Sequence, residues 1–307
     1  MTDRVAALDC GSNSTRLLVA DRHRGALRRE MRITRLSQGV DESGTLTPEA
    51  LQRSYDVLGE YRAYMDELDV ERGLLVATSA VRDASNGQQF LARAREITGV
   101  DARILSGAEE ATLSYSGATA DLAPDSRLTV IVDVGGGSTE LAVVLDGSMH
   151  SFSMQLGCVR VTERALGSAI VTPERDRDAR VMIENELDRA FAAEPVFAGL
   201  RGGVRLVGLA GTVATLAQLD AGLVSYDRDA VHHRLITRAT VERWRDTLAR
   251  ETPEARLARA GMVKGREDVL AAGLYVLDAV MQRLGVNELL SSENDILDGI
   301  VASLLST

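Results

Sequence analysis

One stretch, residues 130–144, constrains the fold more than any other part of the chain. It contains two apolar, β-branched runs joined by the glycines at 135–137, with Asp133 before the turn and Glu140 after it. Such runs around a glycine turn predict a β-hairpin. Because glycine has no Cβ, main-chain N–H groups at the tip of this hairpin can come close to an anion.

The two carboxylates indicate what kind of anion this is. Asp133 and Glu140 would repel a bare phosphate, so the stretch predicts a phosphate bound together with a hard cation. Carboxylates and water hold Mg²⁺ through oxygen, which makes Mg²⁺ the expected ion, with Mn²⁺ as the alternative. A hairpin that needs glycine only for positive φ angles is the competing interpretation.

The same pattern occurs near the start of the chain. Residues 8–19 match the later stretch, with Asp9 in the place of Asp133 and Leu17 in the place of Leu141, both 124 positions apart. Two copies of one hairpin at this separation predict duplicated α/β halves that face each other across a cleft. A ligand of nucleotide or polyphosphate size is expected between them.

Chain length agrees with two halves. The 307 residues predict two domains of about 150 residues each, with the polar segment 121–126 between them. We therefore expect domains over residues 1–124 and 125–307, with the terminal helix returning to the first one.

Composition excludes several functions and locations. The net charge of −10 argues against nucleic-acid binding, so a polyanion site is expected to be a local basic one. Because no apolar run approaches the ~20 residues of a membrane span, and because no secretory signal is visible, a cytoplasmic protein is expected. Cys10 and Cys158 are expected to be small, buried and reduced side chains.

Six short blocks carry a family resemblance. In order and spacing, the chain resembles the exopolyphosphatase/guanosine pentaphosphate phosphohydrolase (Ppx/GppA) family from about residue 4 to its end. The blocks lie at residues 9–14, 77–86, 106–111, 133–140, 156–160 and 210–212. This resemblance implies two ribonuclease-H-like domains of the actin-like ATPase superfamily that clasp a phosphate chain across an interdomain cleft. It also implies a homodimer.

The residues of the blocks suggest the chemistry. Hydrolysis of a phosphoanhydride needs a positioned water and neutralisation of the transferred phosphoryl group. No histidine constellation is present and no serine has an activating partner, so the base is expected to be a carboxylate. The resemblance implies that this base is Glu110, that Asp133 and Glu140 hold Mg²⁺, and that Asp9 is a further candidate ligand.

The glycine turns and the resemblance together give a set of residues expected to bind phosphate. They are Gly11, Ser12, Asn13, Ser14, Arg82, Gly135, Gly136, Gly137, Ser138, Arg160, Gly211, Thr212 and Arg266. The arginine-rich segment 22–35 is either a solvated strand face or a wall of the phosphate channel, with Arg32 and Arg35 nearest to the cleft.

The predicted function is a Mg²⁺-dependent exopolyphosphatase that removes orthophosphate from the end of inorganic polyphosphate. A second hypothesis, in the same reaction class, is a phosphohydrolase that acts on guanosine pentaphosphate, with guanosine tetraphosphate as a related partner. A third hypothesis is a phosphotransferase that uses polyphosphate or ATP. The fourth is a nucleotide or polyphosphate sensor without catalytic activity.

Overall fold

The computed structural model describes residues 3–306, and the chain forms two compact units. One unit contains the chain up to Ala120 together with the segment from Asp295 onward, and the other is Asp121–Asn294. The chain thus leaves the first unit at Ala120, whereas the sequence-based boundary lies between residues 124 and 125. Both units are α/β, as predicted, and each is built on one mixed sheet.

The sheet of the first unit has the strand order β3-β2-β1-β4-β5. Its strands are β1 (Arg4–Cys10), β2 (Ser14–Asp21), β3 (Gly25–Ile33), β4 (Arg72–Ala77) and β5 (Asp101–Ile104). The first three pair as an antiparallel meander, while β4 and β5 continue the sheet parallel to β1. This arrangement agrees with the ribonuclease-H-like domain that was expected.

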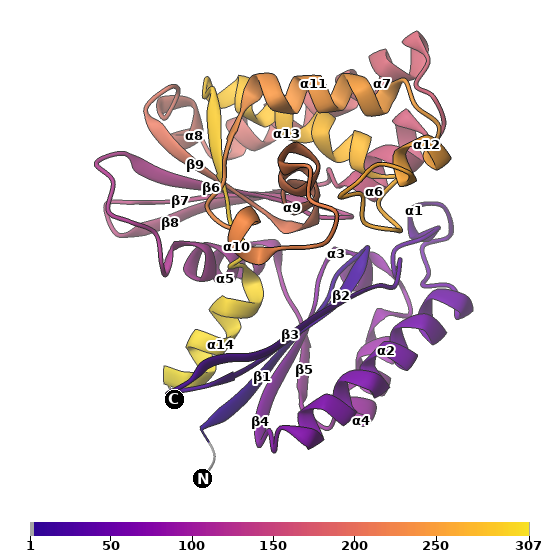
Figure 1. Cartoon of the computed structure of the whole chain (residues 1–307), viewed down its shortest axis with the longest axis vertical. Coiled ribbons are helices and arrows are strands. Elements are labelled where there is room, and N and C mark those ends of the chain that lie inside the picture. Colours follow the sequence, from indigo (N-terminus) through magenta and orange to yellow (C-terminus); the bar gives the residue numbers. More distant parts are fainter. Residues whose placement is uncertain (1–2, 307) are drawn as a thin grey trace. The chain divides into compact units, whose positions relative to one another are not determined.

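Helices cover both faces of this sheet, which explains why residues 5–8 of β1 form an unbroken apolar run. Ala6 and Leu8 of β1 face a core with α2 and α4, and Val5 and Ala7 face a second core with α14. Figure 1 shows α2 and α4 together on one side and α14, in yellow, on the other. The helices are α1 (Val40–Ser43), α2 (Pro48–Glu67), α3 (Ser79–Asp83), α4 (Gly87–Thr98), α5 (Gly107–Thr119) and α14 (Ile296–Ser306).

The sheet of the second unit repeats this order with one strand more, β10-β11-β9-β6-β7-β8. The strands β6, β7 and β8 form the antiparallel meander, and β9 and β11 continue it in parallel. The bounds are β6 (Leu128–Val134), β7 (Thr139–Leu145), β8 (Ser148–Met154), β9 (Val204–Leu209), β10 (Leu235–Thr237) and β11 (Glu288–Ser291). The predicted hairpin within residues 130–144 is thus β6 and β7.

The helices of the second unit share one large core, in which α13 is buried along most of its length. Two of them begin at a Thr-Pro-Glu sequence, where the side chains of Thr172 and Thr252 accept hydrogen bonds from the first helical turn. The elements are α6 (Cys158–Val161), the π-helix η1 (Thr162–Leu166), α7 (Pro173–Ala193), α8 (Val196–Gly199), α9 (Ala210–Ala221), α10 (Arg228–Val231), α11 (Arg238–Ala249), α12 (Pro253–Leu257) and α13 (Leu270–Leu284). Across residues 3–306, no helix combines the length and the apolar character that crossing a membrane requires.

Candidate functional site

The two predicted hairpins have the same turn. In the first unit Gly11 donates its N–H to the carbonyl oxygen of Ser14 at 3.0 Å, and in the second Gly135 donates to Ser138 at 3.1 Å. In both, the aspartate of β1 or β6 pairs directly with a charged residue of the next strand, Asp9 with Arg16 and Asp133 with Glu140. The repeat seen in the sequence is therefore a structural repeat as well.

The second hairpin places two carboxylates opposite each other. Asp133 is only 8% exposed and Glu140 only 1% exposed, and the Ser153 hydroxyl donates to Glu140 Oε1 at 2.6 Å. Like charges on directly paired strand positions destabilise a sheet. Two buried oxygen ligands side by side suit a hard divalent cation, which would remove that repulsion.

The segment 157–160 holds the second glycine loop in place through hydrogen bonds to its carbonyl oxygens. The N–H groups of Cys158 and Val159 donate to the carbonyl oxygens of Gly135 and Gly136, both at 2.9 Å. The guanidinium of Arg160 donates from Nε to the carbonyl oxygen of Gly137 at 2.7 Å. A Cβ at Gly157 would lie 2.1 Å from the Gly136 oxygen, so this contact requires glycine.

A third glycine turn joins the same assembly. Thr212 donates its hydroxyl to the carbonyl oxygen of Val134 at 3.1 Å, at the end of β6. Arg266 lies against Gly211 so closely that a Cβ there would be 1.8 Å from Nη2. Ala210, just before them, has a φ of 65°, a left-handed conformation that non-glycine residues rarely adopt. All predicted site residues of the second unit are thus brought together around its hairpin.

In the first unit the hairpin loop connects to Arg82 and Glu110. The hydroxyl groups of Ser12 and Ser79 lie 3.0 Å apart, which ties the loop to the start of α3. Arg82, on α3, donates to the carbonyl oxygen of Leu105 at 2.8 Å and forms an ion pair with Glu110 Oε2 at 3.4 Å. The predicted base and the predicted phosphate ligand are therefore direct neighbours.

The two acids at the start of α5 have different tasks. Glu109 forms a capping box with Ser106, whose N–H donates to Glu109 Oε2 at 2.9 Å. Hydrogen bonds from Ser106 lower the pKa of Glu109, in keeping with a carboxylate engaged in a cap. Glu110 is 8% exposed and points to Arg82 instead. Position on the helix thus separates a structural acid from the candidate catalytic one.

Asp9 differs from Asp133, its counterpart in the repeat. Arg16 donates to Asp9 Oδ2 from Nε at 3.0 Å and from Nη2 at 2.6 Å, while the buried Oδ1 atom has no hydrogen-bond partner. Burial raises the pKa of Asp9, although the Arg16 guanidinium acts in the opposite direction. Only the Oδ1 atom is thus available to a ligand.

Unpartnered polar atoms gather at the first hairpin loop. Of seven such buried side-chain atoms among the described residues, four are Asp9 Oδ1, Asn13 Oδ1 and Nδ2, and Ser37 Oγ. Buried polar groups without partners are rare, and a bound ligand is one explanation for such a cluster. A hydrated phosphate or cation bound at this loop would supply the missing partners of these four atoms.

Ser37 was not predicted from the sequence. The N–H groups of Thr34 and Ser37 donate to the carbonyl oxygens of Asn13 at 3.1 Å and Ser12 at 2.9 Å, so this segment borders the loop. Arg35 between them has a φ of 50°, a strained conformation of the kind that collects at functional sites. No motif marks Ser37, because its place follows from the path of the chain after β3.

The arginines of β3 are engaged within their own unit. Arg32 contacts Glu30 at 3.0 Å and Glu60 at 2.6 Å, and Arg28 contacts Glu30 at 3.0 Å. These pairs favour the interpretation of this segment as a strand face stabilised by ion pairs.

Asp121, His232 and His233 meet in the second unit, although no spacing of histidines in the sequence predicts a cluster. Their ligand atoms lie within 4.8 Å of one another. However, the N–H of Glu293 donates to His232 Nδ1 at 3.0 Å, so neutral His232 carries its proton on Nε2, facing Asp121 Oδ2 at 2.9 Å. When a histidine binds a metal through one ring nitrogen, the N–H of its other ring nitrogen donates a hydrogen bond to an acceptor. In His232 the Nδ1 atom accepts a hydrogen bond instead. The cluster therefore links the first and last segments of this unit by hydrogen bonds.

Fold and site together define the class of protein. Each unit carries a glycine-containing loop between its first two strands, and acidic and arginine side chains lie close to each loop, so the chain is an α/β protein of duplicated architecture.

Comparison with known proteins gives the family. The model of the Ppx/GppA phosphatase family matches residues 18–307. Exopolyphosphatase 2 of Mycobacterium tuberculosis is 39% identical over 317 aligned positions, which cover 98% of each chain. The crystal structure of an exopolyphosphatase-like protein superposes with a TM-score of 0.92 at 33% identity, covering 99% of both chains. An exopolyphosphatase from Cytophaga hutchinsonii gives 0.86 at 26% identity, covering 99% of this chain and 98% of that one.

The chain belongs to the Ppx/GppA phosphatase family. It is accordingly a hydrolase of a family that acts on phosphoanhydride bonds.

Proposed function

We propose that this protein is a Mg²⁺-dependent exopolyphosphatase that releases orthophosphate from the end of inorganic polyphosphate. Relatives that are similar over the whole chain are named exopolyphosphatases. The observation that carries the proposal is the buried Asp133–Glu140 pair at the base of a glycine loop. Such a pair is stable beside a phosphate chain only when a cation accompanies the phosphates.

The residues present fit a magnesium ion. Asp133 and Glu140 would hold it, directly or through water. Asp9, whose Oδ1 has no protein partner, stays the further candidate ligand that the resemblance implies. When bound, Mg²⁺ neutralises charge on the phosphate oxygens and orients them. The two glycine loops would bind the phosphate oxygens through N–H groups and hydroxyls.

Glu110 is proposed as the general base. Its carboxylate would accept a proton from the water that attacks the terminal phosphorus, and Arg82 would hold the carboxylate in place through their ion pair. Arg82 would also stabilise the charge that develops on the transferred group. Arg160 and Arg266 would bind phosphates on the side of the second unit.

The direct test is phosphate release by the purified full chain. Tripolyphosphate, longer polyphosphates, guanosine pentaphosphate and ATP are compared with and without Mg²⁺, and again with Mn²⁺. We expect release from polyphosphate that needs the divalent ion. Faster release from guanosine pentaphosphate would instead support the alternative substrate, and turnover only with an added acceptor would indicate a phosphotransferase. Binding of these compounds without any turnover would support the hypothesis of a sensor without catalytic activity.

The proposed base is tested with a neighbouring control. Glu110→Gln should lower kcat by about 10²–10⁴-fold, because it removes the group that accepts the proton. Glu109→Gln changes the preceding residue of the same helix but only weakens a cap, so its kcat should stay within about threefold of wild type. A Glu110→Gln enzyme that keeps more than about a tenth of wild-type activity would show that another group is the base.

The remaining predictions need measurements of other kinds. A homodimer, expected from the resemblance, is tested by the mass of the protein in solution. Cytoplasmic location is tested by fractionating the cells that produce it.

A further inference from the structure

The C-terminal helix begins beside the first hairpin. The chain returns to the first unit at Asp295, and α14 starts with the next residue. Asp295 Oδ1 accepts the N–H of Leu297 at 2.9 Å, and Asp298 Oδ2 accepts the N–H of Asp295 at 2.8 Å. One oxygen of Asp295 therefore caps the helix, and its other oxygen, Oδ2, accepts a hydrogen bond from Arg16 Nη1.

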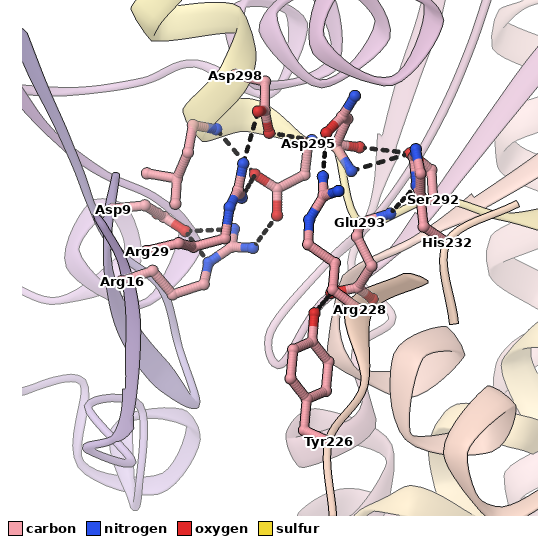
Figure 2. A network of polar contacts seen from close by, with 12 residues as sticks. Asp9, Arg16, Arg29, Tyr226, Arg228, His232, Ser292, Glu293, Asp295 and Asp298 are labelled. Carbon is pink, nitrogen blue, oxygen red and sulfur yellow. Dashed lines mark hydrogen bonds and ion pairs between the residues drawn. The ribbon is translucent and has the colours of Figure 1, made fainter. Parts of the chain in front are cut away.

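Arg16 thus connects two carboxylates from opposite ends of the chain. Its Nη1 donates a hydrogen bond to Asp295, and its Nε and Nη2 both donate to the same oxygen of Asp9, Oδ2, as Figure 2 shows. An arginine with one carboxylate partner prefers two parallel hydrogen bonds, one to each oxygen. The contact with Asp295 holds the guanidinium away from that arrangement, and Asp9 Oδ1 keeps no protein partner.

A second arginine belongs to the same network. Arg29 contacts Asp298 at 2.5 Å, and its Nη1 lies 3.9 Å from Asp295 Oδ1. The pair of Arg29 and Asp298 does not include Asp9, so Asp298 is a suitable control for Asp295.

We propose that Asp295 is a positioning residue for the candidate metal side of the first hairpin, acting through Arg16 on Asp9. The inference rests on the proposed function and extends it to a residue outside the six sequence blocks. Without the carboxylate of Asp295, Arg16 turns to bind both oxygens of Asp9. Asp9 Oδ1 is then occupied by Arg16 and is no longer available to a ligand.

The test compares two aspartates of one helix turn. Asp295→Asn keeps an oxygen that can cap α14 but removes the charge that holds Arg16. Asp298→Asn removes the same charge from the same turn and loses the contact with Arg29, whereas the contact between Arg16 and Asp295 remains. A purely structural role would therefore give both variants the same behaviour.

Two measurements are made on the full-length protein. One is the Mg²⁺ concentration that gives half-maximal phosphate release from tripolyphosphate. The other, without substrate, is the dissociation constant of Mn²⁺ from its paramagnetic resonance signal. We expect Asp295→Asn to raise both at least fivefold with kcat at saturating Mg²⁺ within threefold of wild type. In Asp298→Asn both quantities should stay within twofold of the wild-type values. Asp295→Glu should restore both quantities most of the way to wild type.

Several outcomes would overturn the inference. Equal shifts in Asp295→Asn and Asp298→Asn would show that only the helix start matters, as would a fall in kcat with unchanged ion dependence. If Asp295→Asn does not fold, Asp295→Ser, which also keeps a capping oxygen, takes its place. Wild-type protein that binds Mn²⁺ but releases no phosphate would contradict the proposed function, while the Mn²⁺ comparison would still decide the role of Asp295.

Discussion

The two hairpins share their turn but differ in the charge placed opposite the aspartate. In the first, Arg16 pairs with Asp9 and neutralises it, whereas in the second, Glu140 pairs with Asp133 and doubles the negative charge. The side chains of both pairs are largely buried, so neither pair lies in solvent at the surface. One repeated backbone therefore supports two different electrostatic environments.

This difference suggests a division of labour between the copies. The second hairpin places two carboxylates opposite each other, and these are the proposed ligands of the cation. In the first hairpin Arg16 binds Asp9 Oδ2, and the unpartnered groups are Asp9 Oδ1, the amide of Asn13 and the hydroxyl of the neighbouring Ser37. Substitutions at matched positions of the repeat test this division.

The largest expected effect is on catalysis in the second hairpin. Glu140→Gln should lower kcat/KM by about 10²–10⁴-fold, because it removes a ligand of the proposed ion. The same change should leave the ion-free protein as stable as wild type, or up to about 1 kcal/mol more stable, since it ends the repulsion from Asp133. Steady-state kinetics and denaturant unfolding in chelator measure the two quantities. Reduced stability in chelator would contradict the repulsion.

The matched change in the first hairpin should act on stability. Arg16→Gln leaves the carboxylates of Asp9 and Asp295 without their guanidinium, so the free energy of unfolding should fall by about 3 kcal/mol. Chemical unfolding in the same ion-free buffer gives the comparison with Glu140→Gln. If both glutamines had the same effect on unfolding, the two hairpins would not differ as described.

Gly157, which packs against the second loop, and Gly11, which lies within the first, should also respond differently to substitution. A Cβ at Gly157 would lie 2.1 Å from the Gly136 oxygen, and a Cβ at Gly11 would lie 3.2 Å from the Ser14 oxygen. Gly157→Ala should therefore cost about 1–3 kcal/mol of stability, as overpacking does, while Gly11→Ala should cost less than about 1 kcal/mol. Thermal and denaturant unfolding of both variants decide the order. The reverse order would mean that the second loop is free to shift.

The smallest effect is expected at the edge of the first loop. Ser37→Ala removes a buried hydroxyl that has no protein partner, so stability should not fall. The KM for tripolyphosphate should rise about 3–10-fold if this hydroxyl binds the ligand. Ser43→Ala is the control, because Ser43 lies in the same segment with its hydroxyl bound to the Gly39 carbonyl oxygen at 2.8 Å. Equal KM values for both variants would remove Ser37 from the site.

Much of the fold and part of the site could be predicted from the sequence. The hairpins and the helix starts at Thr172 and Thr252 depend on local patterns of apolar, glycine and capping residues. The residues predicted to bind phosphate in the second unit come together because most of them lie where a strand of its sheet ends or where the following helix begins. Strand ends on one edge of a sheet are neighbours by construction.

Other parts of the site had no local signal. The spacing of Ser106 and Glu109 is that of a capping box, but the contact of Glu110 with Arg82 follows only from the placing of α5 beside α3. Ser37 borders the first loop because of the path that the chain takes after β3. The histidines at 232 and 233 meet Asp121 only through the folding of the second unit.

Residue types at short and regular spacings were enough to predict the duplicated hairpin, the α/β class and the family. The tertiary structure alone decided which charges neutralise one another: Arg16 could have been assigned to any acid, and it binds Asp9 and Asp295 at the two ends of the chain. The reason is physical. Spacing along the chain fixes backbone conformation, but the energy of a buried charge depends on the groups that packing brings within a few ångströms of it.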